Sequence, residues 1–232
     1  MSATTVWDCR EPAQRDRGIA GAVAAMRRGG LVIFPTENCY VVATDAFSVK
    51  GTALLRRAKV QAPSTPLGLL VAGPETVSGV AARVPPAAQV LMQTFWPGLL
   101  TLLMRPQATL AWDHPPSAPV AVRMPLHPLA LALCGRVGPI AASAASVAGG
   151  LAPVDVEEAI EGLADDVAVA CDVGRVGDCG WSSLEDPQLP STVVDVRTRV
   201  ATVVREGAIP AERVEAVLGE LAGDTVAGEP TG

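Results

Sequence analysis

The segment Leu31–Tyr40, which reads LVIFPTENCY, decides the fold class of this chain. Its first four residues are an uninterrupted apolar run, which is typical of a short buried strand, and Pro35 ends that run. Residues 36–40 then form a polar loop at the end of the predicted strand. Because α/β sheets place ligand-binding groups at strand ends, this loop is the first candidate for a functional site.

Helical and strand patterns alternate on both sides of this segment. Apolar residues at helical spacing predict helices over 18–28, 49–58, 74–84, 86–95, 127–136 and 155–163. Short apolar runs predict further strands over 67–71, 99–104, 120–123, 140–143, 167–172, 192–196 and 202–205. Such alternation indicates one α/β domain. We expect that domain over 18–221, with an N-terminal extension over 1–17 and a flexible C-terminal tail over 222–232.

The charge balance narrows the choice of partners. The 232 residues include 18 Lys and Arg against 24 Asp and Glu, which gives a net charge of −6. This argues against a broadly basic surface that coats nucleic acid, but it leaves room for a local cationic pocket. No apolar run reaches the roughly 20 residues that span a bilayer, and the N-terminus is unlike a signal peptide. We therefore expect a cytoplasmic protein with no membrane partner.

The five cysteines and two histidines follow no metal-binding pattern. There is no Cys-x-x-Cys pair and no cysteine–histidine cluster, so we expect reduced thiols and no metal held by the protein. A site built from His114 and His127 would require the fold to bring these two residues together.

Polar and cationic residues recur at predicted strand ends and loops. They are Thr36, Tyr40, Lys59, Arg123, Ser143, Ser146, Ser191 and Arg205. We expect a subset to line one concave cavity, namely Thr36, Lys59, Arg123, Ser191 and Arg205. The chain has no Walker-type glycine loop and no Gly-x-Gly-x-x-Gly, so an ATP site would have to use side chains.

Six short motifs follow one another in a fixed order. They are Pro35–Tyr40, Lys59 with Pro66-Leu67 after it, Phe95–Gly98, Arg123-x-Pro125, Ser191–Asp195 and Arg205-x-Gly207. A further matching stretch, Pro139–Gly149, lies between the fourth and the fifth motif. In this order they resemble the YrdC-like, threonylcarbamoyl-AMP synthase family over about 19–218. The resemblance implies a YrdC-like α/β fold, in which a twisted mixed sheet with flanking helices encloses a concave ligand cavity.

The resemblance also implies an activity. Family members use ATP, bicarbonate and L-threonine to make threonylcarbamoyl-adenylate and pyrophosphate, an intermediate in tRNA modification. It implies ATP with Mg²⁺, bicarbonate as co-substrate, and a small amine or amino acid substrate, with tRNA involved only indirectly. By the same resemblance, Lys59 and Arg123 are catalytic. Nucleotide contacts fall on Lys59, Ser143, Ser146 and Arg205, and substrate contacts fall on Thr36, Tyr40, Arg123 and Ser191.

The chain also departs from the family pattern. A Lys-Arg-Ser-Asn tetrad of the family is matched here by Lys59, Gln61, Ala144 and Ser146, so only the lysine is kept. Neutral Gln61 cannot form a guanidinium fork on phosphate, and such donors are typically worth ~3–4 kcal/mol in the transition state. We therefore expect a divergent carbamoyl-adenylate-forming enzyme whose amine need not be threonine, in specialised metabolism rather than tRNA modification.

The alternative is a non-catalytic YrdC-like protein that binds a nucleotide, an anion or RNA, double-stranded RNA included. The loss of three tetrad residues favours this alternative, whereas the presence of Lys59, Arg123, Ser191 and Arg205 opposes it. The sequence leaves the amine and the oligomeric state open.

Overall fold

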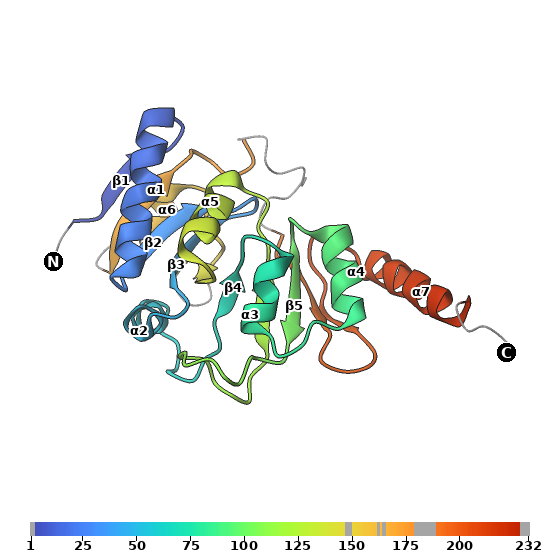
Figure 1. The fold of residues 1–232 in the computed structure, drawn as a ribbon. Helices are drawn as coiled ribbons and strands as arrows, with labels where there is room; N and C mark the ends of the chain where they lie inside the picture. The colour runs from blue at the N-terminus through green and yellow to red at the C-terminus, as the bar shows by residue number, and fades with distance from the viewer. Residues whose placement is uncertain (1–2, 147–149, 162, 164–165, 179–188, 228–232) are drawn as a thin grey trace.

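A single sheet of ten strands forms the centre of the molecule. The computed structural model describes residues 3–146, 150–161, 163, 166–178 and 189–227. The strands are β1 (Thr5–Asp8), β2 (Leu31–Pro35), β3 (Tyr40–Asp45), β4 (Gly68–Leu70), β5 (Leu100–Met104), β6 (Val120–Arg123), β7 (Ile140–Ala144), β8 (Val167–Asp172), β9 (Thr192–Asp195) and β10 (Thr202–Arg205). They lie in the order β1-β8-β2-β3-β7-β4-β6-β5-β9-β10, so that the sheet crosses the whole molecule from the N-terminal to the C-terminal side (Figure 1).

The sheet is mixed, and β2 and β3, the third and fourth strands in its order, form a hairpin that contains the segment Leu31–Tyr40. Strands β2 and β3 are antiparallel, with Pro35 opposite Tyr40 and Val32 opposite Ala43. On the far side of β3, β7 is also antiparallel, whereas β4 pairs with β6, and β5 with β9, in parallel. Because β2 and β3 are buried along nearly their whole length, this hairpin fixes the loop at residues 36–39 rigidly at one end of the sheet.

Helices cover the two faces of the sheet unequally. They are α1 (Pro12–Arg27), α2 (Val49–Ala58), the 3-10 turn η1 (Pro74–Thr76), α3 (Val77–Val80), α4 (Pro86–Phe95), α5 (Pro128–Val137), α6 (Val156–Glu161) and α7 (Ala211–Ala227). Helices α2, α3, α4, α6 and α7 pack into one apolar core, which runs under the sheet from β8 to β10. Helices α1 and α5 build the second core, which lies on the opposite face.

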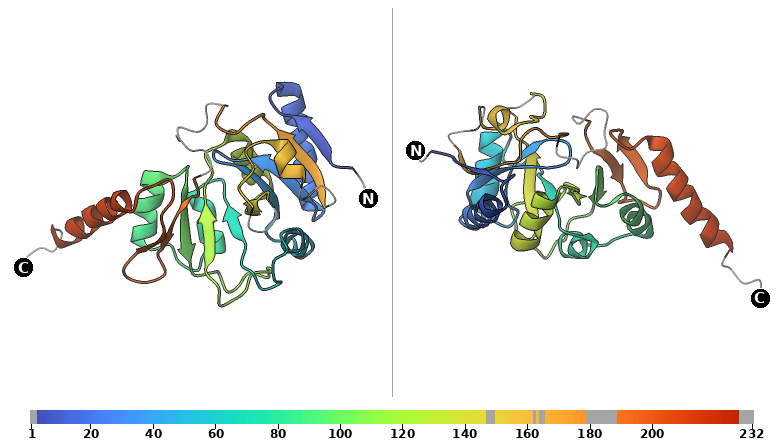
Figure 2. Two further views of the ribbon diagram at one scale, coloured as in Figure 1. Left: turned by 180° about the vertical axis from the view of Figure 1, so that it is seen from behind. Right: turned by 90° about the horizontal axis from the view of Figure 1, so that it is seen from above.

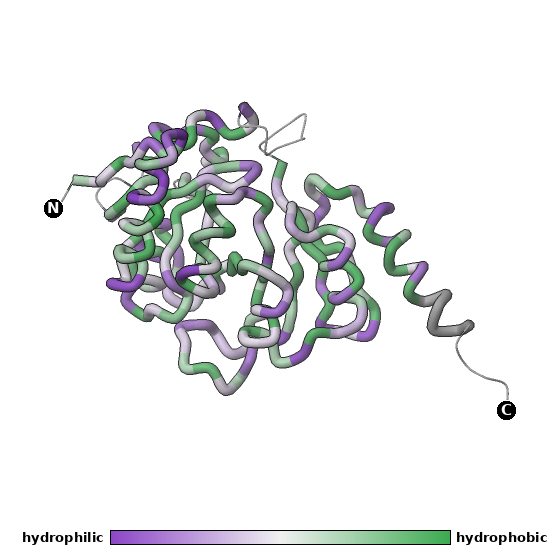
Figure 3. The backbone as a smooth tube through the Cα atoms, turned by 45° about the horizontal axis from the view of Figure 1, so that its top comes forward, coloured by the Kyte–Doolittle hydropathy of each residue, from purple (hydrophilic) through white to green (hydrophobic). Residues whose placement is uncertain are grey.

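The second core ends partway across the sheet. Side chains alternate along β3, so that Tyr40 and Val42 face the first core while Val41 and Ala43 face the second. Of the described residues, β2, β3, β4, β7 and β8 contribute buried side chains to the second core, but β5, β6, β9 and β10 contribute none. This half of one face is therefore left for polar side chains. Figure 3 shows green, hydrophobic stretches of the chain running through the body of the molecule, as expected for the interior of a layered domain.

The predicted mixed sheet with flanking helices is confirmed, and several elements differ in extent. Strand β1, within the predicted extension, pairs in parallel with β8, and α1 begins at Pro12 rather than Gly18. The predicted helix over 74–84 is a 3-10 turn followed by a short helix that ends at Val80. Helix α7 was not predicted; it runs to Ala227 and projects from the body of the molecule (Figure 2). The domain boundaries themselves stay a prediction.

Within the described part of the chain, no helix combines the length and the apolar character that a membrane span requires.

Candidate functional site

The loop between β2 and β3 is held by its own polar side chains. Thr36 is fully buried, and its Oγ1 lies 2.8 Å from the carbonyl oxygen of Cys39 and 3.0 Å from Oδ1 of Asn38. The backbone N–H of Thr36 also donates to the Cys39 carbonyl, over 2.8 Å. A hydroxyl that bonds to its local backbone stabilises a tight turn. Thr36 thus fixes the positions of Glu37, Asn38 and Cys39.

Arg123, the last residue of β6, is fixed against this loop. Its Nη2 lies 2.7 Å from Oε1 of Glu37 and donates to Oδ1 of Asn38 over 3.1 Å, while its Nε donates to the Gly98 carbonyl over 3.2 Å. Glu37 is 3% exposed, so its negative charge is stabilised chiefly by this guanidinium and by the N–H of Leu126. Arg123 Nη1 donates to none of the described residues.

A second guanidinium approaches from the far edge of the sheet. Arg205 on β10 donates through Nη2 to the carbonyl of Ser191 over 2.8 Å and to its hydroxyl over 3.2 Å. The Ser191 hydroxyl lies 2.8 Å from Oγ1 of Thr101 on β5. Desolvation of Arg205, and secondly the positive charge of Arg123, lower the pKa of the Arg205 guanidinium. Arg205 has no carboxylate partner among the described residues, so none of them compensates its charge.

Arg123 and Arg205 border one cavity of about 360 Å³, which we call the sheet cavity, whereas Thr36 and Glu37 lie outside its lining. It lies at the border of the second core, over β3, β7 and β4 as well as over β5, β6 and β10, which α1 and α5 leave uncovered. Four of the predicted site residues line it, namely Arg123, Ser143, Ser191 and Arg205. The remaining polar lining comes from Asn38 and Thr101. Its apolar lining includes Val41, Leu69, Leu70, Ala121, Ala142, Ala144 and Ala152.

Lys59 lies beside the sheet cavity rather than in its lining. It follows the last turn of α2, is 5% exposed, and its Nζ donates to the carbonyl of Ala144 over 2.8 Å and to the carbonyl of Ser146. Burial lowers the pKa of this ammonium group. Lys59 therefore holds the end of β7, whose Ala144 lines the sheet cavity. The Ser146 hydroxyl lies 3.4 Å from the Gly150 carbonyl and is not in the lining either.

Tyr40 is the predicted residue that the structure separates from the sheet cavity. Its ring belongs to the first core, under the opposite face of the sheet. Its hydroxyl donates to the Gly174 carbonyl over 2.7 Å and accepts from the N–H of Val173 over 3.0 Å. The period of two along β3 explains this placement, because Cys39 and Val41 face the sheet cavity and Tyr40 between them must face away.

Three residues of this site were not among the predicted site residues. Glu37 and Asn38 position Arg123, and Thr101 bonds to Ser191. The signal for the first two was their place next to Thr36 in a loop already chosen as a candidate. Gln61 has its side-chain oxygen buried with no hydrogen-bond partner in the described part of the chain, at the position where the family pattern has an arginine.

The lining of the sheet cavity does not match a protein-held metal site. Among its described residues there is no carboxylate, and no group of three or more His, Cys, Asp and Glu gathers anywhere in the described part of the chain. Mg²⁺ prefers carboxylate and phosphate oxygens. A magnesium ion in this cavity would therefore have to be held by the phosphates of a nucleotide.

Comparison with known proteins agrees with the sequence motifs. The Sua5/YciO/YrdC family model, described as telomere recombination, matches residues 24–207. A putative threonylcarbamoyl-AMP synthase of Mycobacterium tuberculosis is 39% identical over 217 residues, which are 93% of this chain and 96% of that protein. The threonylcarbamoyl-AMP synthase of Bacillus subtilis is 32% identical over 214 residues, which are 91% of this chain and 59% of that protein.

Solved structures give the same result for the fold. P. abyssi Sua5 complexed with L-threonine superposes with a TM-score of 0.81 at 29% identity, over 94% of this chain and 62% of that one. E. coli YciO superposes with a TM-score of 0.72 at 23% identity, over 91% of this chain and 98% of that one, a likeness that concerns the fold alone. The predicted YrdC-like fold is confirmed, and the chain belongs to the Sua5/YciO/YrdC family.

Proposed function

We propose that this protein forms a carbamoyl-adenylate from ATP, bicarbonate and an amino acid or another small amine, with the sheet cavity as its active site. One observation carries the proposal. Two guanidinium groups, from Arg123 and Arg205, reach one cavity together with the Ser191 hydroxyl, and Arg205 has no carboxylate partner in the described structure. Relatives named threonylcarbamoyl-AMP synthase over most of this chain's length support the same reaction class.

The reaction explains why such a cavity would be needed. The amine and bicarbonate combine to a carbamate with loss of water, a carbamate oxygen attacks the α-phosphorus of ATP, and the bond to the leaving pyrophosphate breaks. Both reactants are anions, so the protein has to hold them in line and offset their negative charges. In our proposal Arg205 and Ser191 bind the nucleotide phosphates, and the free Nη1 of Arg123 binds the carboxylate of an amino acid.

The apolar lining supports an amine other than threonine. Ala144, at one of the positions where the chain departs from the family pattern, and Val41 bring methyl groups into the sheet cavity. An apolar wall cannot accept a hydrogen bond from a substrate hydroxyl, so it discriminates little in favour of threonine. We propose a less polar amino acid or amine as substrate, in a pathway other than tRNA modification, with tRNA at most an indirect partner.

A pyrophosphate-release assay with ATP, with and without bicarbonate, over a panel of amino acids and amines tests the proposal. We expect release that requires both bicarbonate and one class of amine, with the adenylate identified by its mass. Arg205→Gln should lower the rate about a hundredfold, because it removes a charged donor to phosphate. The matched control is Arg199→Gln, which removes an exposed arginine between β9 and β10 and should leave the rate within about twofold.

The second candidate is a non-catalytic protein that binds a nucleotide or another anion in the sheet cavity. The observation in its favour is that Lys59, the one tetrad residue that is kept, bonds to two backbone carbonyls instead of facing the cavity. Saturable ATP binding without pyrophosphate release for any amine would establish this candidate and overturn the first.

A further inference from the structure

A larger cavity lies outside the sheet cavity and shares no lining residue with it. This second cavity has a volume of about 560 Å³, within the range of roughly 300–1,000 Å³ that is typical of small-molecule sites. Three segments that are distant in sequence build its walls. They are Cys9 to Arg15 at the start of α1, His127 to Leu129 at the start of α5, and Val173 to Asp178 after β8. Helices α1 and α5 pack against each other over the same face of the sheet (Figure 1).

Cationic side chains outnumber carboxylates in its lining. Arg10, Arg15 and Arg175 line the second cavity, whereas Asp178 is the one carboxylate among its lining residues. Arg10 is paired with Asp8 over 2.8 Å and with Asp172 over 3.5 Å, and Arg175 lies 3.7 Å from Asp155. Both side chains are more than half exposed, so these pairs leave them accessible to a ligand. The chain as a whole has a net charge of −6, whereas this lining has more positive than negative side chains. The second cavity therefore favours an anion.

Arg15 is the uncompensated cation of this group. Its Nε donates to the Cys9 carbonyl over 2.8 Å and its Nη2 to the Arg10 carbonyl over 3.3 Å. No described carboxylate pairs with it, and its Nη1 has no described acceptor. The two backbone bonds hold the guanidinium fork in place while leaving its charge uncompensated, which is the arrangement that binding of an oxyanion requires.

His127 adds a neutral polar wall. Its Nδ1 accepts from the N–H of Leu129 over 3.2 Å, so the ring hydrogen is on Nε2. Burial lowers the pKa of His127 to about 4, so the ring carries no charge at neutral pH. Pro128, Leu129 and Val173 supply apolar surface beside it. The second cavity therefore combines cationic groups with an apolar wall large enough for an organic ligand.

We propose that the second cavity binds a small molecule that carries a phosphate group. A phosphate presents three acceptor oxygens to guanidiniums from different directions, and the three arginines here come from two segments that are distant in sequence, Arg10 and Arg15 from the first and Arg175 from the second. A carboxylate has only two oxygens, which lie in one plane, so it can form a bidentate pair with just one guanidinium. The site is separate from the proposed reaction and does not depend on it.

The two histidines of the chain make the proposal testable by NMR. His127 lines the second cavity, whereas His114 stacks on Trp112 in another part of the molecule. We expect inorganic phosphate, titrated at constant pH and ionic strength, to shift the ring signals of His127 saturably and to leave those of His114 unchanged. Arg15→Gln should weaken the binding about tenfold, because it removes a charge-assisted hydrogen bond.

Arg17→Gln is the matched control, since it removes the same charge from the same helix two residues away, where a side chain points elsewhere. It should change the affinity by less than about twofold. If Arg15→Gln disturbs the fold, Arg175→Gln tests the same cavity with α1 intact. Arg205→Gln, which alters the sheet cavity, should keep the His127 response.

Each of four results would overturn the proposal. They are no saturable shift of His127, an equal response of His114, equal weakening by Arg15→Gln and Arg17→Gln, or loss of the His127 response in Arg205→Gln, which would assign the phosphate to the sheet cavity.

Discussion

At the scale of single residues, Glu37 is the buried counterion that fixes Arg123. Its carboxylate is 3% exposed and lies 2.7 Å from the guanidinium. Glu37→Gln keeps an oxygen for the Leu126 N–H but removes the negative charge, so the Arg123 charge loses its partner. Breaking a buried pair from one side typically costs about 3–5 kcal/mol, and we expect a loss of about 3 kcal/mol in the free energy of unfolding, measured with denaturant.

An exposed ion pair provides the control for this measurement. Arg57, whose side chain is 71% exposed, pairs with Asp166 over 2.6 Å. Arg57→Gln should cost less than about 1 kcal/mol, because water already screens this pair. Equal losses in the two variants would mean that Glu37 is solvated in the folded protein, and the positioning of Arg123 would then need another cause.

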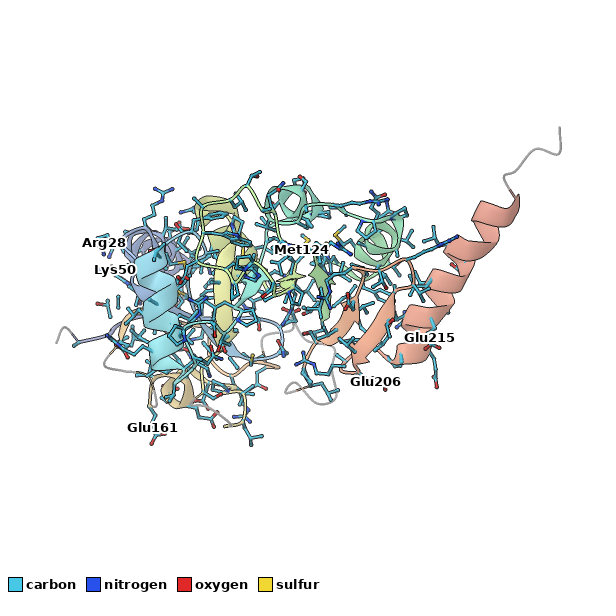
Figure 4. All side chains as sticks on the ribbon, turned by 90° about the horizontal axis from the view of Figure 1, so that it is seen from below. Arg28, Lys50, Met124, Glu161, Glu206 and Glu215 are labelled. Carbon is cyan, nitrogen blue, oxygen red and sulfur yellow. The ribbon has the colours of Figure 1, made fainter. Side chains whose placement is uncertain are left out.

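The two lysines of the chain provide a second comparison at this scale. Lys59 Nζ bonds beside the sheet cavity, whereas Lys50 Nζ lies 3.5 Å from the Arg28 carbonyl, at a distant corner where Figure 4 shows the two residues together. Lys59→Ala leaves two carbonyls at the end of β7 without their donor. We expect it to weaken ATP binding about tenfold, measured by calorimetry, against less than about twofold for Lys50→Ala. Similar losses that fade with added salt would instead indicate a long-range field effect.

At the scale of elements, the start of α5 should make stability depend on pH. His127 is the N-cap of this helix, and burial lowers its pKa from an ordinary 6.5 to about 4. Between these two values the unfolded chain binds more protons than the folded protein. The contribution of His127 is therefore fully present above about pH 6.5 and is lost as the pH falls toward 4, with a cost of about 2 kcal/mol by pH 5.

His127→Asn isolates this effect. The asparagine oxygen can cap α5 in place of Nδ1, but the side chain does not titrate. Unfolding measured at pH 7.5 and pH 5 should show a drop for the wild type that is about 2 kcal/mol larger than the drop for the variant. An identical drop in both proteins would assign the acid sensitivity to other groups.

The elements that the sequence failed to predict are those whose stability comes from distant partners. Strand β1 has four residues and acquires its ladder only by pairing with β8, more than a hundred positions later in the chain. Helix α7 buries Val214 completely, and its other described side chains are exposed or partly exposed, so the helix needs few apolar positions and its sequence shows only a weak apolar pattern. The buried strand β2 and helix α2, whose patterns are local, were predicted within one residue at each end.

At the scale of the whole molecule, sheet topology decides which predicted residues meet. Arg123, Ser191 and Arg205 lie on β6, beside β9 and on β10, and the strand order brings these strands to one cavity. The motifs identified the residues but not the directions of their side chains. Tyr40 and Lys59 follow the same motifs, yet strand alternation turns one to the opposite face and burial directs the other to backbone carbonyls.

The net negative charge of the whole molecule should oppose the binding of double-stranded RNA. A duplex is held by many cations that each neutralise a phosphate, and this chain has 18 Lys and Arg against 24 Asp and Glu. With a net charge of −6, the field around the molecule repels polyanions. We therefore expect ATP to bind while a double-stranded RNA of about 16 base pairs, the span of a typical duplex-binding domain, shows no saturable anisotropy change at physiological salt. The control is the same RNA with an established duplex-binding domain. Saturable binding that weakens steeply with salt would contradict this expectation and would support the RNA-binding alternative, since counterion release is the signature of a phosphate-tracking surface.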